Sequence, residues 1–449
     1  MSHPTGFSCV RCGNVFPLDL EIDSRGCPKC VAVAPANLQV TYHSQSLAPD
    51  DLTQQGHPPS LWRYANMLPC ASDDAISLGE GLTPLLPATT IGSALGVPNL
   101  LIKDEGRNPT WSHKDRFSTV AVSMARLSGA RVVATASSGN AGASLAAYAA
   151  RAGLRCVVVT FAGTAGAMLA QIKKYGANVV PLTDKSERWP LLAAGVERFG
   201  WFATSPFQAP VVGSHPVGVE GYKTLAYEIF EQMQGSMPDW CVLPVCYGDA
   251  LAGMFQGFTD LLEQGKIDLI PRLAAAEIHG SLSEALASET DLIAEAPAAF
   301  ETLAVSMGTT RSTFQALRAL RLSRGTAVRV GNFGLIALQQ QLAASEGIFA
   351  ELASVTPLAA IGTLRRQGVI GASDRVVAVV TASGLTQRQS QFAAGICMNK
   401  VNTNREKFCD VEVCHPLHSR NGYPCSLSGC GKGDHYGRNY PNRRAVYFR

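Results

Sequence analysis

The segment RVVATASSGNAGASLAAYAARAGL, residues 131–154, contains the pattern that decides the fold. Its first part, 131–137, is a short run of β-branched and small apolar residues, as expected of a buried strand. A polar turn with glycine follows, and an alanine-rich stretch that ends near Gly153 indicates a helix. A strand, a tight turn and a helix form the repeating unit of α/β proteins with parallel sheets.

The same unit recurs along the chain. Further strands are predicted at 99–105, 155–161, 178–183, 239–245, 272–278 and 374–384. Further helices are predicted at 112–130, 164–177, 186–199, 218–235 and 246–265. Because the strands are short and apolar on both faces, we expect an α/β fold with helices covering both sides of parallel sheets. Two α/β units that divide near residue 210 are expected.

The composition is that of a folded protein with more than one domain: 449 residues, 46% of them apolar and 16% charged. No apolar run reaches the roughly 20 residues of a membrane span, and the N-terminus lacks a basic region followed by an apolar one. We therefore expect no membrane partner and a cytoplasmic location. From residue 400 onward there are 9 Lys/Arg and 4 Asp/Glu, so the remaining chain has 29 minus 31, or −2. A nearly neutral body predicts no nucleic-acid partner.

Four cysteines near the N-terminus have the spacing of a metal site. Cys9 and Cys12 form one C-x2-C pair, and Cys27 and Cys30 form another fourteen residues later. Each pair can direct two thiolates at one ion, and Zn²⁺ is the common occupant of a four-sulfur site. Four thiolates leave no open position for a substrate, so we expect a structural zinc ribbon over residues 1–40.

A second, looser set of cysteines lies in the C-terminal tail, residues 391–449. It comprises Cys409, Cys414, Cys425 and Cys430, with His418 and His435 nearby. The tail is rich in Gly, Asn, Pro and Arg and poor in aliphatic residues, so it cannot bury much core. An irregular or disordered tail and a second metal site both remain open.

Small polar residues follow four of the predicted strands. They are the stretch leading to Lys114, the turn Ser137-Ser138-Gly139-Asn140-Ala141-Gly142, the loop 246–250, and the loop 381–384. Ligands of parallel α/β sheets bind beyond the carboxyl ends of the strands. Glycine-opened helix starts can cradle a phosphate, hydroxyl and amide groups can bind a ring heteroatom, and a lysine can form an imine with an aldehyde. Pyridoxal phosphate needs all three together. Taken singly, a solvated Lys114 and a simple helix cap at 137–140 explain these residues as well.

Six ordered motifs carry a family resemblance. They are LGEGLTPL (78–85), IKDEGRNPTWSHKDR (102–116), SSGNAGASLAAYAARAGL (137–154), MLAQIKKYGANVV (168–180), GVEGYKTLAYEI (218–229) and VVAVVTASGL (376–385). Together they resemble the threonine synthase branch of the fold-type-II, tryptophan synthase β-like pyridoxal-phosphate enzymes. The resemblance covers roughly residues 78 to 387, and the cysteine-rich N-terminus resembles the zinc ribbon of some threonine synthases and cysteate synthases.

The resemblance implies a domain order and a set of cofactor residues. An entry segment and the first part of a large α/β domain would span 41–112, a small α/β domain 113–210, and the rest of the large domain 211–390. Lys114 would hold the cofactor covalently and act as the catalytic base. Asn140 would bind the cofactor's 3-hydroxyl group, and Thr381 would face its pyridine nitrogen.

The remaining implied residues lie in two loops. The phosphate cup would consist of Cys246, Tyr247, Gly248, Asp249 and Ala250. Ser137, Ser138 and Ala141 would hold the carboxylate of a small amino-acid substrate.

Three positions depart from the family pattern. His113 stands where a phenylalanine is common, Trp111 stands where a glycine is common, and 246–250 replaces a glycine- and asparagine-rich tract. His113 can pack or can carry a proton. Asp249 beside a phosphate is unfavourable unless its carboxylate points away, caps the following helix or binds a substrate amine.

The resemblance implies a lyase that eliminates phosphate from O-phosphohomoserine and adds water to give threonine, in a possible homodimer. Burial is expected to lower the pKa of Lys114, as a base requires. The departures keep open β-elimination or β-replacement on serine, phosphoserine or threonine-like substrates, as in deaminases or cysteate synthases. A non-catalytic relative is disfavoured because Lys114, Asn140 and Thr381 are all present.

Overall fold

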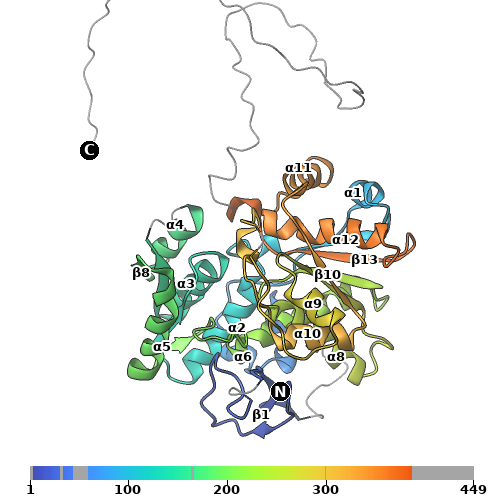
Figure 1. The fold of residues 1–449 in the computed structure, drawn as a ribbon. Helices are drawn as coiled ribbons and strands as arrows, with labels where there is room; N and C mark the ends of the chain where they lie inside the picture. Colours follow the sequence, from blue (N-terminus) through green and yellow to red (C-terminus); the bar gives the residue numbers. More distant parts are fainter. Residues whose placement is uncertain (1–3, 31–33, 44–58, 163–165, 299, 387–449) are drawn as a thin grey trace, which may run out of the picture. The chain divides into compact units, whose positions relative to one another are not determined.

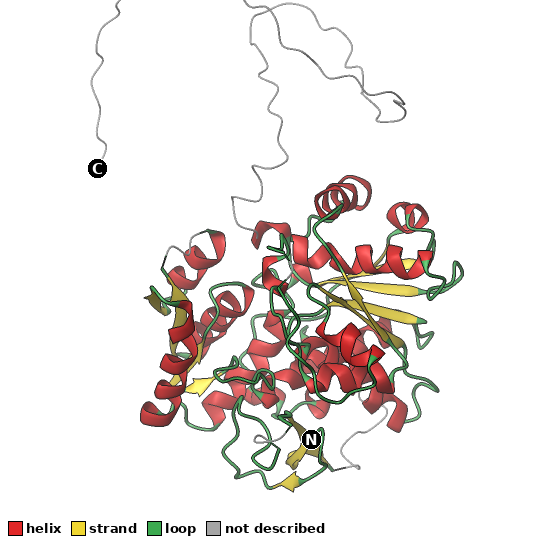
Figure 2. Cartoon of the chain, viewed as in Figure 1, coloured by secondary structure: helices red, strands yellow, loops and turns green. Residues whose placement is uncertain are grey.

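The computed structural model describes residues 4–30, 34–43, 59–162, 166–298 and 300–386. Within them the chain forms a six-stranded sheet, a four-stranded sheet and a small three-stranded sheet (Figures 1 and 2). The predicted α/β class is therefore correct. The predicted tail and its second cysteine cluster lie outside the described residues.

The six-stranded sheet has the spatial order β12-β11-β10-β13-β5-β4. Its strands are β4 (Leu85–Pro87), β5 (Leu100–Asp104), β10 (Trp240–Pro244), β11 (Arg272–Glu277), β12 (Thr326–Arg329) and β13 (Val376–Val380). Five of them run parallel, but β4 pairs antiparallel with β5 at one edge. The expectation of a purely parallel sheet was thus wrong at this edge. Residues 88–99 between the two strands contain the short helix α1 (Thr89–Ala94), after which the chain returns beside β4 in the opposite direction.

Alternate residues of the central strands face two separate cores. Cys241 and Leu243 pack with helices α8 (Asp249–Glu263) and α10 (Phe314–Leu322). Trp240 and Val242 pack on the opposite face with α11 (Leu335–Glu346) and α12 (Thr356–Arg366). On β13, Val377 packs in the same core as Cys241 and Leu243, and Val376 packs in the core on the opposite face. This two-residue period with apolar groups on both faces explains why the strands lack polar residues.

The four-stranded sheet is fully parallel, in the order β8-β7-β6-β9. Its strands are β6 (Val132–Thr135), β7 (Arg155–Phe161), β8 (Asn178–Leu182) and β9 (Phe202–Ala203). Core residues of α3 (Asn140–Ala152) and α4 (Ala167–Lys174) pack against one face of it, and Leu192 of α5 (Arg188–Phe199) packs against the other. Figure 1 shows α3, α4 and α5 gathered around β8.

The described α-helices follow the predicted ones closely in the first two thirds of the chain. Their bounds are α1 (Thr89–Ala94), α2 (Lys114–Leu127), α3 (Asn140–Ala152), α4 (Ala167–Lys174), α5 (Arg188–Phe199), α6 (Pro216–Val219), α7 (Thr224–Gln232), α8 (Asp249–Glu263), α9 (Ser281–Ala287), α10 (Phe314–Leu322), α11 (Leu335–Glu346) and α12 (Thr356–Arg366). The predicted helix 218–235 is interrupted, because a 3₁₀ segment (Glu220–Lys223) joins α6 to α7. Among the described residues, no helix is long and apolar enough to cross a membrane.

The small sheet consists of β1 (Pro4–Cys9), β2 (Val15–Phe16) and β3 (Leu38–Tyr42) in the order β2-β1-β3, all antiparallel. Phe7, Leu38 and Val40 form its core together with three of the cysteines. Val217 of α6 packs into the same core, so the N-terminal segment rests on the body of the protein.

Candidate active site

Three of the four predicted loops leave the same edge of the six-stranded sheet. β10, β13 and β5 are adjacent and parallel, so the segments after their carboxyl ends are neighbours. The fourth loop, 136–140, follows β6 of the other sheet and leads into α3. Asn140 in this loop hydrogen-bonds Glu351, which also contacts the loop after β13, so the site lies between the two sheets.

Lys114 is the first residue of α2, and its half-buried side chain ends beside a tyrosine that we did not predict. The Nζ atom lies 3.3 Å from the hydroxyl of Tyr222. Gly221 and Gly253 fix this tyrosine, because a Cβ at Gly221 would lie 1.8 Å from the Arg116 carbonyl oxygen and one at Gly253 would lie 2.6 Å from Tyr222 Cβ. The contact joins residues 108 positions apart in the sequence, so no local pattern could reveal it.

Burial lowers the pKa of Lys114, but Tyr222 and the Asp249 carboxylate more than offset this, and the pKa lies above its ordinary value. The expectation of a lowered pKa was wrong for the protein without its cofactor. The amine is therefore held as an ammonium at neutral pH, and it must lose a proton before it can attack a carbonyl carbon.

His113 and Trp111 attach the start of α2 to the loop after β13. The His113 N–H donates to the Thr381 carbonyl oxygen at 2.8 Å, its Nδ1 lies 3.1 Å from the same oxygen, and Ser383 N–H donates to the Trp111 carbonyl oxygen at 2.9 Å. Burial and the nearby Lys114 charge hold the pKa of His113 well below its usual range. The imidazole is thus neutral, and its ring stacks on Tyr222. These contacts favour the packing role over that of a proton carrier.

Asn140, at the start of α3, is bound by a glutamate that the sequence analysis did not identify. Its Nδ2 donates to Glu351 Oε2 at 3.2 Å, and the Thr386 hydroxyl donates to the same oxygen at 3.1 Å. The Glu351 N–H also donates to the Ala382 carbonyl oxygen. Burial raises the pKa of this carboxyl group, which lies near Lys114 as well. Glu351 therefore bridges the turn before α3 and the loop after β13.

In the turn 137–141, the backbone of Ser137 lies very close to Gly142 in the first turn of α3. A Cβ at Gly142 would lie 2.0 Å from the Ser137 carbonyl oxygen, so the turn requires glycine there. Ser137 and Ser138 are half-buried in this turn, and the Ser137 hydroxyl accepts from Gly139 N–H. Ala141 lines the same pocket as Lys114.

The loop 246–250 contains a glycine with a left-handed backbone, Gly248, directly before the first residue of α8. Gly248 has φ +92°, and a Cβ there would lie 2.3 Å from Ala316 Cβ. The Tyr247 carbonyl oxygen accepts from the hydroxyls of Ser312 and Thr313. The first N–H groups of α8, which begin at Asp249 and Ala250, have no acceptor within the helix and carry the positive end of its dipole. Such a helix start can hold a phosphate.

Asp249 is the one acidic group in this loop, and its carboxylate is bound by protein donors. It accepts from the Ser214 hydroxyl at 2.7 Å, from Ser214 N–H, and from Gln315 Nε2 at 2.6 Å. Asp249 was expected to point away from the phosphate, to cap the helix or to bind a substrate amine. Its hydrogen bonds to Ser214 and Gln315 match the first of these roles. Nearby Cys246 is a partly buried thiol whose pKa burial raises to about 11, so it is not a thiolate at neutral pH.

Thr381 is buried directly after β13, and a serine orients its hydroxyl. Thr381 Oγ1 and Ser354 Oγ are 2.9 Å apart, and Ser354 Oγ accepts from the Ala382 N–H. If Ser354 donates to Thr381, the Thr381 hydroxyl proton is free for another acceptor. A neutral hydroxyl facing a pyridine nitrogen would leave that nitrogen largely unprotonated.

A pocket of about 310 Å³ beside Lys114 tests whether pyridoxal phosphate fits. Hydroxyl groups dominate its lining, which consists of Lys114, Phe117, Ser118, Thr135, Ala141, Thr204, Ser205, Ser214 and Tyr222. Thr135 is 1% exposed, and its Oγ1 has no hydrogen-bond partner among the described residues. An orphaned buried hydroxyl beside a lysine amine is expected where a polar ligand completes the site. The residues present therefore fit the cofactor.

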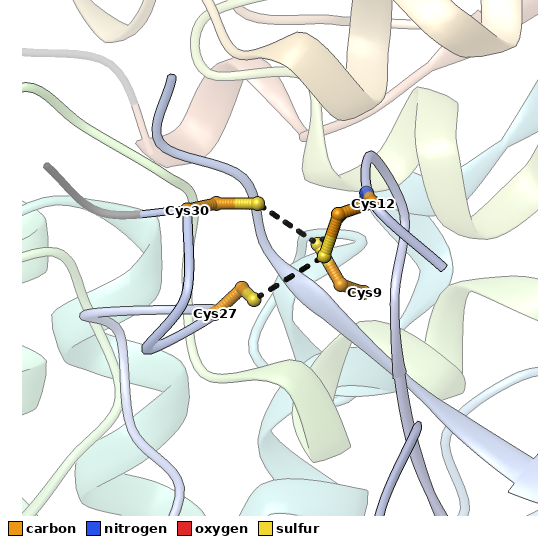
Figure 3. A group of neighbouring side chains, drawn as sticks. All are labelled: Cys9, Cys12, Cys27 and Cys30. Carbon is orange, nitrogen blue, oxygen red and sulfur yellow. Dashed lines mark hydrogen bonds between the residues drawn. The ribbon is translucent and has the colours of Figure 1, made fainter. Parts of the chain in front are cut away.

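The four N-terminal cysteines converge as predicted (Figure 3). Cys9 Sγ lies 3.7 Å from Cys30 Sγ, Cys12 Sγ lies 3.8 Å from Cys27 Sγ, and all four sulfurs lie within 4.8 Å of one another. A tetrahedral site with Zn–S bonds of about 2.3 Å places its sulfurs about 3.8 Å apart. The N–H groups of Arg11 and Cys12 donate to Cys9 Sγ, which is the geometry of a metal knuckle.

Comparison with known families now identifies the class of protein. The model of the pyridoxal-phosphate dependent enzyme family matches residues 76–382, and the chain belongs to that family. Its threonine synthase-like character follows from its relatives. The threonine synthase of Methanosarcina acetivorans is 33% identical over 388 residues, covering 85% of this chain and 92% of the relative. That of Methanocaldococcus jannaschii is 31% identical over 413 residues, covering 90% and 97%.

Solved structures share the fold with a wider set of activities. Maize serine racemase aligns with a TM-score of 0.58 at 18% identity, covering 67% of this chain and 88% of that one. Threonine deaminase isoform 2 from Solanum lycopersicum aligns with a TM-score of 0.57 at 19% identity, covering 70% and 81%. At these identities the likeness concerns the fold alone. With the family and the relatives together, the protein is a pyridoxal-phosphate-dependent lyase of fold type II.

Proposed function

We propose that this protein is a threonine synthase, which releases phosphate from O-phosphohomoserine and adds water to form threonine. The observation that carries the proposal is the meeting of Lys114, Asn140, the helix start at 246–250 and Thr381 between the two sheets. The identity to threonine synthases along most of the chain supports the choice of reaction. When bound, pyridoxal phosphate supplies an electron sink for carbanion chemistry at the substrate.

The chain's own residues would divide the work as follows. Lys114 would bind the cofactor and move protons as the general base, with Tyr222 fixing its Nζ atom. The backbone amides of Gly248, Asp249 and Ala250 would hold the cofactor phosphate with the dipole of α8. Asn140 and Thr381 would orient the ring.

The substrate would bind on the side of the four-stranded sheet. Ser137, Ser138 and Ala141 lie in the turn before α3, where N–H groups and hydroxyls can receive a carboxylate. Arg188 adds a positive charge there: its Nη1 donates to the Ala136 carbonyl oxygen at 3.4 Å, and it lies close enough to Tyr247 to affect that hydroxyl. A cation at this place suits a substrate that carries its own phosphate.

A zinc ion in the N-terminal ribbon forms the second part of the proposal. Cys9, Cys12, Cys27 and Cys30 would bind Zn²⁺ as a structural ion, because four thiolates leave no open position. Metal analysis of purified protein should find one zinc ion per chain, and Cys27→Ser should reduce it. Wild-type protein that contains no metal after purification without chelators would refute this part.

The reaction itself is tested with a substrate panel. Phosphate release and amino-acid products would be measured with O-phosphohomoserine, phosphoserine, serine and threonine, with Lys114→Ala as the inactive control. Threonine formed from O-phosphohomoserine is the expected result. Release of ammonia or a replacement product from serine or phosphoserine alone would assign the protein to the alternative β-elimination or β-replacement class.

A further inference from the structure

A second pocket lies away from Lys114, where the N-terminal ribbon rests on the body of the protein. It has about 460 Å³ of space. The ribbon contributes Val10, Leu38 and Gln39. Helices α6, α8 and α10 and the 3₁₀ segment Glu220–Lys223 form the remaining walls. This space includes the open mouth of the pocket, so the site is a surface hollow and not an enclosed cavity.

Of the charged side chains that line this pocket, Lys223 and Glu220 form an ion pair with each other. Lys223 Nζ lies 2.9 Å from Glu220 and 3.2 Å from Asp260, and the Tyr42 hydroxyl donates to Glu220 at 2.7 Å. Arg318 of α10 also lines the pocket and is half-buried, yet it forms no ion pair with a carboxylate in the described part of the chain. Burial alone lowers the pKa of this guanidinium group, since no neighbouring charge opposes the effect.

The rest of the lining defines what could accompany such a cation. Val10, Leu38 and Phe255 provide apolar walls, and Gln39 and Gln256 provide side-chain amides. A guanidinium group favours a carboxylate, which it can bind with two parallel hydrogen bonds. We propose that this pocket binds a small organic acid with a short aliphatic body, whose carboxylate pairs with Arg318, and that its occupancy acts on the cofactor site.

The link to the cofactor site runs through α10. Gln315 lies one turn before Arg318, lines the same pocket and donates to Asp249 Oδ1 at 2.6 Å. Asp249 begins α8 at the predicted phosphate cup and raises the pKa of Lys114. A carboxylate that draws Arg318 toward itself would therefore shift the helix that positions Asp249. Val10 lies between the ribbon cysteines, so the ribbon would also help shape the pocket.

Binding is tested on the full-length protein with 4-methylpentanoate as the probe, by calorimetry and ligand-observed NMR. Its uncharged amide, 4-methylpentanamide, is the matched control ligand. We expect saturable binding of the acid to the wild type and to Arg324→Gln, an exposed arginine just beyond α10, and at least about tenfold weaker binding to Arg318→Gln. Absence of saturable binding to the wild type, equal binding of the amide, or unchanged binding to Arg318→Gln would overturn the proposal.

A second variant keeps the test valid if Arg318→Gln folds poorly. Gln39→Glu leaves Arg318 in place and adds a carboxylate from β3, so it should also exclude the acid. The effect on the cofactor site is measured as the dissociation constant of pyridoxal phosphate, from its visible absorption, with and without 4-methylpentanoate. A change of about fivefold that disappears in Arg318→Gln is expected. An unchanged constant would overturn the link to the cofactor, and neither measurement depends on which substrate the enzyme turns over.

Discussion

Lys103 and Lys114 lie on consecutive elements and have opposite surroundings. Lys103, on β5, is fully buried and donates to the Thr83 carbonyl oxygen at 2.6 Å, Glu228 Oε2 at 2.6 Å and Gln232 Oε1 at 2.9 Å. Lys114, at the start of α2, has one such partner among the described residues, the Tyr222 hydroxyl at 3.3 Å. All three protons of the first ammonium are bound, whereas the second keeps two of them available.

This difference separates a structural lysine from a reactive one. Lys103 belongs to a buried network in which Arg116 bridges Glu105 and Glu228 at 2.7 and 2.6 Å. Such a network is rigid because every charge has a partner. An amine that must change its bonds during a reaction cannot be committed in this way. Burial therefore marks the lysine that holds the fold, and incomplete hydrogen bonding marks the one that can react.

Replacing Lys114 by alanine should have the largest effect. We expect activity to fall by about 10³-fold or more and the visible absorption of the bound cofactor to disappear, because the attacking amine and the base are lost together. The free energy of unfolding should change by only about 1 kcal/mol, since the side chain is half-buried with one long hydrogen bond. Steady-state kinetics, absorption spectra and denaturant unfolding measure the three quantities. A variant that keeps the visible band would contradict the assignment of this lysine.

Replacing Lys103 by methionine should show the reverse pattern. Loss of its charge leaves Glu228 and Gln232 with unfilled acceptors in a buried site, which should cost about 3 kcal/mol of unfolding free energy. The folded variant should still develop the visible band with added pyridoxal phosphate. Lys173→Met, at an exposed position of α4, is the control for the loss of one lysine. A Lys103→Met variant that is as stable as the wild type but lacks the visible absorption band of the bound cofactor would contradict the assignment of Lys103 as structural and Lys114 as reactive.

The two lysines also show how far sequence reasoning reaches. The strand and helix rhythm from 99 to 265 is local, so hydrophobic periodicity and glycine turns predicted it, and motif resemblance placed Lys114, Asn140 and Thr381 near one another. Tyr222 and Glu351 could not be found in this way, because their partners lie 108 and 211 residues away in the sequence. Such contacts depend on how helices pack. The carboxyl-terminal helices α9 to α12 and strand β12 carried no signal that we recognised.

Removing the Tyr222 hydroxyl should have a moderate effect with a defined sign. Tyr222 helps to raise the pKa of Lys114, so Tyr222→Phe should lower that pKa and increase the fraction of neutral amine at a given pH. Each unit of lowering multiplies the neutral fraction about tenfold below the pKa. We expect the visible band to form severalfold faster at neutral pH, and its pH dependence to shift to lower pH.

The control for this change is Tyr64→Phe, since Tyr64 hydrogen-bonds Glu231 and makes no described contact with Lys114. Stopped-flow mixing of cofactor-free protein with pyridoxal phosphate across a pH series provides the measurement. A shift to higher pH, or an equal shift in both variants, would show that Tyr222 does not act on the amine.

The smallest effect concerns Trp111, which has a left-handed backbone with φ +67°. A left-handed conformation costs a residue with a side chain roughly 1–2 kcal/mol, and glycine avoids this cost. Trp111→Ala removes the ring and keeps the strain, whereas Trp111→Gly removes both, so glycine should be more stable than alanine by about 1 kcal/mol. Denaturant unfolding of the two variants isolates the backbone contribution. Because the indole is 39% exposed beside Lys114's helix, a change in substrate preference shared by both variants would assign the tryptophan to substrate choice, whereas unchanged preference would leave it only a backbone role.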